Sequence, residues 1–306
     1  MMAKPRRARP ALDDDIPLSP LADPVVGAIF CDAEHAGLAM ESLAGAVTAK
    51  DGITIGKILS VTPQSYLKQP NLRGVRLDIE GKDDQNHDII MEVQLNTDIY
   101  MLYRNVFAAA HAMVDRVPEG TKSDDLMKVM PKIIVIDLLN YNLREDNRDY
   151  LQPIKMLYTK PPVREALSQI SIYVVQLPRI REIEQNFDDD LYCWLYTLDR
   201  AHQERKTIQE VLNMEPKLKS FAEKNAGFKQ YRDRYGRVTS SRKLRDEYFR
   251  WMDTQIHEAG LFQGGKLEGK LEGKLEAAKN FLAMGLSPEQ VAQGTGLPIS
   301  DVQALQ

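Results

Sequence analysis

The chain has 306 residues, of which 43% are hydrophobic and 27% charged, and its formal net charge is −4. This composition is typical of a globular protein with a real core and excludes a protein coated in positive charge. The two distant cysteines, Cys31 and Cys193, exclude a disulfide framework, and the absence of a long apolar run or an apolar leader favours a cytoplasmic protein with no membrane partner.

Residues 1–20 are rich in Pro, Arg and Asp, which predicts a flexible basic arm. The pattern becomes helical at Asp23, which can cap a helix, and Pro24 suits its first turn. Apolar residues then recur at helical spacing up to Val47, with a predicted break between Asp32 and His35. The segment "ITIGKILSVTPQSY" that follows has the composition of a β-strand.

The stretch "RLDIEGKDDQNHDIIMEVQ", from Arg76 to Gln94, contains two short apolar alternations separated by a polar turn. This pattern predicts a β-hairpin. Asp78 and Glu92 are equidistant from Gln85 in the middle of the turn, so the two carboxylates should lie opposite each other on one face. Directly opposed like charges are destabilising, unless something neutralises them.

Two interpretations of this acid pair remain open at the level of the sequence. The first is an ordinary solvated hairpin face, which acidic pairs usually form. The second is a metal site, because a divalent cation removes the repulsion and Mg²⁺ prefers hard oxygen ligands. Asp78, Glu92 and the carbonyl of Val93 would be its ligands, and the ion would promote hydrolysis of a phosphodiester. Gln94, on the same face, is placed to orient water or a phosphate oxygen but cannot act as a base.

The segment from Thr97 to Val117 predicts a helix with Thr97 as N-cap. Its predicted apolar stripe contains Ile99, Leu102, Val106, Ala110, Met113 and Val117. Next, "KIIVIDLL" has the continuous apolar character of a strand buried on both faces. "PVREALSQI" then predicts a short helix and "ISIYVVQLP" another strand. This order of elements predicts an α/β sandwich with a mixed sheet, complete by about Pro178.

The chain after that point has mostly helical patterns. Lys229 to Arg250 contains eight Lys/Arg against three Asp/Glu, with aromatic residues between the cations. Such a segment can hold phosphates and stack on bases. The alternative is that its aromatic residues pack a helix against the core.

The four-residue repeat "GKLEGKLEGKLE" runs from Gly265 to Glu276. Its lysines align along a helix, its glutamates do the same, and each glycine costs a helix about 1 kcal/mol relative to alanine. The repeat therefore predicts either self-association, in which a lysine stripe meets a glutamate stripe, or a flexible tether. Beyond it, Ser287 to Gln290 forms a capping box, and the tail resembles a helix-turn-helix. Its second helix, Ser300 to Gln306, has no Lys or Arg for base contacts.

Five features together resemble a known family: "DPVVGAIF", "RLDI", "MEVQ", Arg104 and "KIIVIDLL". They resemble the D…ExQ form of the PD-(D/E)XK nuclease superfamily and, within it, the Rpn family of recombination-promoting nucleases and transposases. The resemblance implies a restriction-endonuclease-like α/β sandwich, with a mixed central sheet flanked by helices and a helical C-terminal region after it. It also implies a Mg²⁺-dependent DNA endonuclease linked to recombination or transposition.

Carried over to this chain, the resemblance makes Asp78 and Glu92 the metal-binding acids and Gln94 the third motif position. Glu41 matches an acidic residue on the first helix. DNA is the implied partner, and its predicted contacts are Arg104, Arg232, Arg234, Arg237, Arg242 and Lys243. The alternative is an accessory DNA-binding protein that retains the fold without activity. The predicted domains are the arm over 1–20, a nuclease-like domain over 21–180, a helical extension over 181–262, and the repeat and tail over 263–306.

Overall fold

The computed structural model describes residues 16–30, 36–63, 66–67, 75–76 and 78–305. The chain divides into two compact units, Met1–Tyr248 and Phe249–Gln306. Most of the predicted arm, and the predicted break between Asp32 and His35, lie outside the described residues. The predicted domain boundaries remain predictions.

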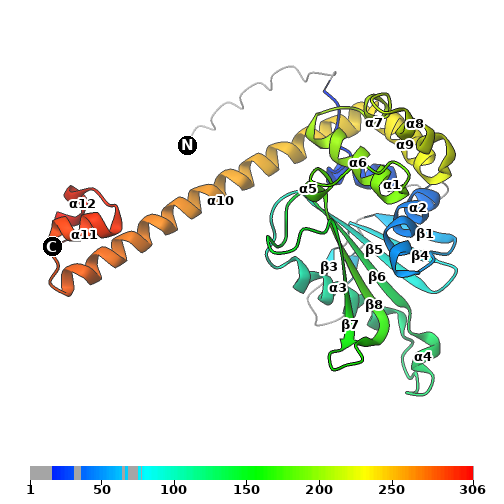
Figure 1. The fold of residues 1–306 in the computed structure, drawn as a ribbon, viewed down its shortest axis with the longest axis horizontal. Coiled ribbons are helices and arrows are strands. Elements are labelled where there is room, and N and C mark those ends of the chain that lie inside the picture. Colours follow the sequence, from blue (N-terminus) through cyan, green and yellow to red (C-terminus); the bar gives the residue numbers. More distant parts are fainter. Residues whose placement is uncertain (1–15, 31–35, 64–65, 68–74, 77, 306) are drawn as a thin grey trace, which may run out of the picture. The chain divides into compact units, whose positions relative to one another are not determined.

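The first unit is built on a six-stranded mixed sheet (Figure 1). In spatial order its strands are β1 (Ile58–Pro63), β4 (Ile79–Asp83), β5 (His87–Gln94), β6 (Lys132–Leu139), β8 (Arg164–Gln176) and β7 (Leu151–Tyr158). The pairs β1–β4, β4–β5 and β7–β8 are antiparallel, whereas β5–β6 and β6–β8 are parallel. The short strands β2 (Tyr66–Leu67) and β3 (Val75–Arg76) pair with each other. This is the mixed sheet that the sequence predicts.

One face of the sheet is covered by α3 (Met101–Arg116), which connects the parallel strands β5 and β6. Small residues of α3 pack on the apolar side chains of the central strands, in a cluster that includes Ala109, Ala112, Ile90, Ile133 and Val135. The short α4 (Leu126–Val129) follows before β6. This crossover places the start of α3 beside the end of β5.

Helices from both ends of the first unit lie on the other side of the sheet. They are α1 (Asp23–Phe30), α2 (Ala36–Thr48), the 3₁₀ turn η1 (Ala49–Asp51), α5 (Leu177–Ile180), α6 (Asp190–Gln203), α7 (Ile208–Leu212), α8 (Pro216–Lys224) and α9 (Ala226–Thr239). Of these, α1 and α2 pack on β1, and the later helices pack on α1, α2 and one another. Met40 of α2 packs on Gly81 of β4, and α2 packs on α9. A Cβ at Gly227 would lie 2.3 Å from the carbonyl oxygen of Leu38, so only glycine permits this close approach of the two helices. Trp194 of α6 is fully buried beside Phe228.

The predicted start of α3 is wrong and its predicted stripe is partly right, since Leu102 and Met113 pack against the core cluster. Tyr100 is the N-cap instead of Thr97, and the Asp98 side chain accepts a hydrogen bond from the Tyr100 amide at 2.8 Å. This local turn delays the helix. The buried residues of α3 are Met101, Asn105, Ala108, Ala109, His111 and Ala112. The buried face is rotated by about one residue, so Ile99 and Val106 are exposed.

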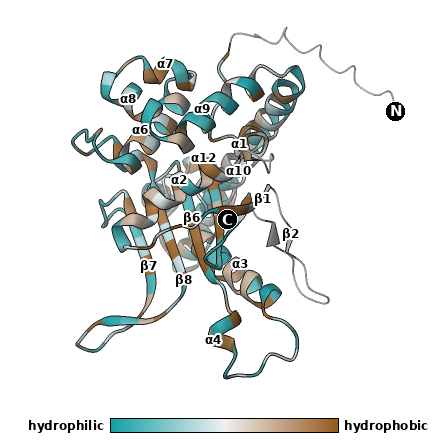
Figure 2. Ribbon diagram, turned by 90° about the vertical axis from the view of Figure 1, so that its right-hand side faces the viewer, coloured by the Kyte–Doolittle hydropathy of each residue, from teal (hydrophilic) through white to brown (hydrophobic). Residues whose placement is uncertain are grey.

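The segment "PVREALSQI", expected to be a short helix, lies almost wholly within β8. Its apolar residues have helical spacing, but β7 supplies the hydrogen bonds of a β-ladder, with Tyr158 opposite Arg164 and Leu157 opposite Glu165. The sequence patterns above predict no strand over Leu151–Tyr158, where the structure has β7 with Pro153 inside it. Proline is tolerated there because β7 is the edge strand. Figure 2 shows the β7–β8 hairpin projecting beyond the rest of the sheet.

The second unit consists mainly of α10 (Arg242–Ala283), whose first turns belong to the first unit, and of α11 (Pro288–Thr295) and α12 (Ile299–Gln303). A small core unites these helices, formed by Ala278, Val291, Leu297 and Val302. The predicted capping box of Ser287 and Gln290 is present. The repeat lies wholly within α10 and is therefore helical instead of an irregular tether. In the described part of the chain, no helix combines the length and the apolar character needed to cross a bilayer.

Candidate active site

The two acids of the hairpin meet across β4 and β5. Asp78 directly precedes β4, and the register of the pair, Ile79 opposite Met91, brings Asp78 opposite Glu92. The backbone amide of Asp78 donates to Oε1 of Glu92 at 3.1 Å. The amide of Val93 donates to Oδ2 of Asp78 at 3.0 Å. Each carboxylate is therefore held by the backbone of the opposite strand, as their equal distance from Gln85 suggests.

The surroundings of Glu92 disfavour its charged form. The residue is 6% exposed. Burial raises the pKa of Glu92 to about 8, and the nearby charges of Asp78 and Asp137 add to this effect. The hydrogen bond from the Asp78 amide and the positive charge of Arg104 act in the opposite direction. Without a cation, Glu92 therefore keeps its proton at neutral pH.

Arg104, near the start of α3, is placed beside this acid. Its guanidinium lies 3.9 Å from Oε2 of Glu92 and forms a closer ion pair, at 2.9 Å, with Asp98. The arginine side chain is 51% exposed, so a phosphate in solution can reach it. The crossover from β5 into α3 thus brings a cation to the edge of the acid pair.

A third acid, which sequence reasoning missed, completes the cluster. Asp137 of β6 is the register partner of Glu92, and it is fully buried on the face that α3 covers. Asn105 of α3 donates to its Oδ2 at 2.5 Å. Burial raises the pKa of Asp137 to about 7, although the hydrogen bond from Asn105 lowers it. The available signal was one carboxylate inside the apolar run "KIIVIDLL".

The remaining motif residues lie at different distances from this cluster. Gln94 is half-buried at the end of β5, on the same face as Glu92 by strand alternation. Glu41 lies on α2, which packs on the opposite face of β4. In the part of the chain that the structure describes, no hydrogen bond or ion pair joins Glu41 to Glu92. The structure therefore does not place Glu41 in the cluster.

The basic residues of α9 and α10 fall into two groups. Arg234 is 9% exposed and donates to the carbonyl of Ala28 at 3.0 Å, so it lies away from any surface that DNA could reach. The Arg232 side chain is mostly buried and pairs with Glu223 at 2.7 Å. The exposed members are Arg237, Arg242 and Lys243. The aromatic residues of this segment, including Tyr231 and Tyr235, are buried, which supports the core-packing interpretation.

The acid cluster provides hard carboxylate oxygens, which suit a divalent cation such as Mg²⁺. Asp78 and Glu92 are close neighbours that would carry like charges when both are ionised, and a cation between them would relieve that repulsion. Among the described residues, no three His, Cys, Asp or Glu side chains converge closely enough to hold one ion directly. The donor set therefore fits an ion held by two carboxylates that keeps several waters.

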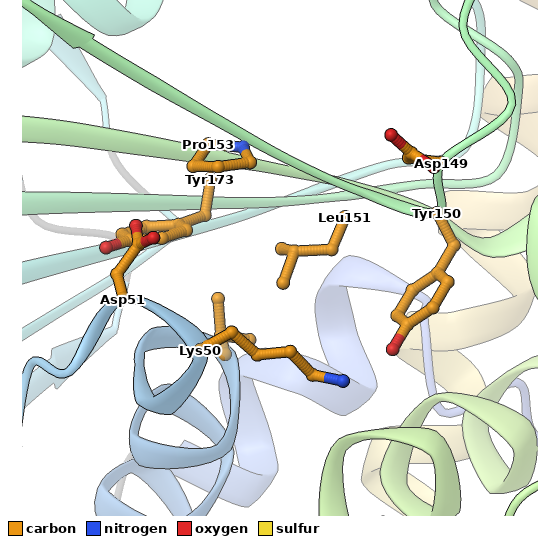
Figure 3. A pocket seen from close by; sticks show the side chains of 8 residues that line it. Lys50, Asp51, Asp149, Tyr150, Leu151, Pro153 and Tyr173 are labelled. Atoms are coloured by element: carbon orange, nitrogen blue, oxygen red, sulfur yellow. The ribbon is translucent and has the colours of Figure 1, made fainter.

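A separate pocket of about 250 Å³ lies where η1 meets β7 and β8. Figure 3 shows Asp51 beside Tyr173 at one end of this pocket and Tyr150 at the other. Two of its charged groups are already in ion pairs: Lys50 with Asp189 at 2.7 Å, and Asp51 with Lys155 at 3.0 Å. Tyr173 pairs with Ile136, the neighbour of Asp137, so the pocket lies on the opposite face of the sheet from the acids.

Comparison with known proteins bears on this site. A family model described as PD-(D/E)XK nuclease family transposase matches residues 32–254, which is well over half of the chain. The matched range includes the whole sheet and all three acids of the cluster. No curated protein and no solved structure matches the chain.

Proposed function

The chain belongs to the PD-(D/E)XK nuclease family transposases, and on that premise we propose that it is a Mg²⁺-dependent DNA endonuclease, linked to recombination or transposition of mobile DNA. The observation that carries the proposal is the pairing of Asp78 with a buried Glu92 whose pKa is raised to about 8. A buried acid pair of this kind is costly to a fold unless a ligand neutralises it, and strongly perturbed carboxylates mark functional sites.

The residues have distinct roles in this proposal. Asp78 and Glu92, with the carbonyl of Val93, would hold the ion. When bound, the ion would polarise a phosphate oxygen and lower the pKa of a bound water. Gln94, at the end of the same strand, has an amide that can orient the attacking water or a phosphate oxygen through hydrogen bonds. Because an amide does not take up protons at neutral pH, Gln94 is not the base.

Substrate binding in this proposal rests on exposed cations. Arg104 lies beside Glu92 and can form charge-assisted hydrogen bonds with a phosphate at the scissile position. Arg237, Arg242 and Lys243 provide further exposed positive charge for the DNA backbone. Such contacts are independent of base sequence, so they position DNA without selecting a site.

The test is incubation of the purified chain with supercoiled plasmid in Mg²⁺ and, in parallel, in EDTA. The variant is Glu92→Gln, which keeps the size of the side chain and removes its charge. Glu119→Gln, at an exposed position outside the cluster, is the matched control. We expect Mg²⁺-dependent nicking or cleavage by the wild type and the control, and a loss of at least about 100-fold in the Glu92 variant.

The rival function is a DNA-binding accessory protein that retains the nuclease fold without activity. It predicts that the wild type and Glu92→Gln shift DNA equally on a gel and that neither cuts it in Mg²⁺. That result would replace the endonuclease proposal.

A further inference from the structure

Asp137 has no role in the function proposed above, yet it is the most deeply buried acid of the cluster. It has no exposed surface, and it occupies the position on β6 opposite Glu92. Residues paired in register on neighbouring strands project to the same face, so Asp137 and Glu92 both face α3. Asp137 therefore belongs to the acid cluster by position.

One oxygen of Asp137 has no donor in the part of the chain that the structure describes. Oδ2 accepts the hydrogen bond from Asn105, but Oδ1 is buried and has no hydrogen-bond partner among the described residues. Leaving a buried carboxylate oxygen unsatisfied is costly, and native proteins rarely do so without a functional reason. The neighbouring charged groups are the acids Asp78 and Glu92 and the cation Arg104. A water or an ion-bound group at this cluster can supply the donor for Oδ1.

We propose that Asp137 is the third carboxylate of the cation site, and that its Oδ1 accepts a hydrogen bond from a water bound to the ion that Asp78 and Glu92 hold. This inference rests on the proposed metal site. Contact through a water agrees with the geometry, because no three acids of the described chain converge on one point. Mg²⁺ keeps several of its waters in protein sites, so such a water is available.

Asn105 positions Asp137 for this contact. Its Nδ2 lies 2.5 Å from Oδ2 of Asp137 and 3.1 Å from the sulfur of Met101, on the same helix. The amide therefore holds Oδ2 of Asp137 and leaves Oδ1 without a donor among the described residues. Outer groups of this kind orient metal sites, and their removal typically lowers metal affinity by about 10- to 100-fold.

The test is titration of the full chain with Mn²⁺ in a calorimeter, which measures affinity without DNA or turnover. The variants are Asp137→Asn, Glu92→Gln, and Asp88→Asn as the matched control. Asp88 lies on β5 and pairs with Arg116 at 2.8 Å, so its substitution removes the same charge from the same face outside the cluster. We expect a Kd weakened by roughly 10- to 100-fold for Asp137→Asn, undetectable binding for Glu92→Gln, and less than about a threefold change for Asp88→Asn.

Each other outcome has one meaning. If Asp137→Asn binds Mn²⁺ as tightly as the wild type, Asp137 is only structural and the inference fails, while the proposed function stands. If the wild type binds no Mn²⁺ or Mg²⁺, the proposed metal site itself is wrong. If Asp137→Asn does not fold, Asn105→Ala is titrated in its place, because it removes the hydrogen bond that holds the Asp137 carboxylate and leaves the charge unchanged. A weakened Kd then supports the inference, and an unchanged Kd overturns it.

Discussion

Glu92 and Asp137 occupy paired positions on the parallel strands β5 and β6, and both are buried under α3. The two side chains lie far apart in the sequence and carry like charges when ionised. Burial raises the pKa of Glu92 to about 8 and that of Asp137 to about 7. A cation bound at this cluster would therefore change both its charge state and the stability of the fold.

The stability of the first unit should fall between about pH 5 and pH 8 in EDTA. Unfolded glutamate titrates near 4.5, whereas folded Glu92 titrates near 8. In that window the folded protein holds a proton that the unfolded chain has released. The free energy of unfolding therefore falls as the pH rises, and it levels off above about pH 8. In Glu92→Gln, the free energy of unfolding should decrease between about pH 5 and pH 8 by at least about 1 kcal/mol less than in the wild type. Urea denaturation at several pH values measures the free energy of unfolding. An equal slope of this free energy against pH in the wild type and in Glu92→Gln would contradict the prediction.

Mg²⁺ should stabilise the protein more at about pH 8.5 than at about pH 6. The ion competes with protons for the same carboxylates, and those protons are mostly lost above the raised pKa values of Glu92 and Asp137. Melting temperatures with and without Mg²⁺ at the two pH values test this. A shift that is equal at both pH values would place the ion elsewhere.

Arg104→Ala should weaken DNA binding and lower the dependence of affinity on salt. Its guanidinium lies beside Glu92 and is half-exposed, so we expect the slope of log affinity against log salt to fall by about 1. Arg144→Ala, an exposed arginine paired with Asp146, is the control and should leave the slope unchanged. Fluorescence anisotropy with a labelled duplex measures both. An unaltered slope for Arg104→Ala would show that this arginine contacts no phosphate.

The basic residues around α9 should separate into a structural and a DNA-binding group. Arg234→Ala removes a buried donor from the Ala28 carbonyl, and should cost about 1–3 kcal/mol of unfolding free energy. The exposed Arg237, Arg242 and Lys243 should tolerate alanine within about 0.5 kcal/mol, and the triple variant should bind DNA more weakly. Denaturation curves and anisotropy, run on each variant, distinguish the groups. Unchanged DNA affinity of the triple variant would remove these residues from the interface.

The repeat in α10 should mediate self-association. Leu267 and Leu271 are 69% and 49% exposed. They are four residues apart and therefore lie on one face of α10, where a second copy of the helix could bury them. We expect a concentration-dependent oligomer of the wild type in analytical ultracentrifugation, and a monomer of the double variant Leu267→Asp, Leu271→Asp. Circular dichroism checks that the variant keeps its helix. A wild type that stays monomeric at all concentrations would reject this proposal.

Much of the fold follows from patterns within single elements. The alternation in β4 and β5, with its polar centre at Gln85, predicts a hairpin in which Asp78 faces Glu92. The capping box at Ser287 and the buried strand "KIIVIDLL" are equally local signals. In each case the interacting residues are near neighbours in sequence, so periodicity and cap chemistry determine the structure.

Other features depended on contacts that the apolar pattern of a single element does not reveal. The helical spacing of "PVREALSQI" gave way to a strand because β7 pairs with it as a β-ladder, and the start of α3 moved because the Asp98 side chain formed a turn with the Tyr100 amide. The sequence by itself determined the hairpin and its acid pair. Only the tertiary structure decided that Asp137 joins them. The register between the parallel strands β5 and β6 is set by how the crossover helix α3 packs, and the alternation of residues within each strand carries no information about that register.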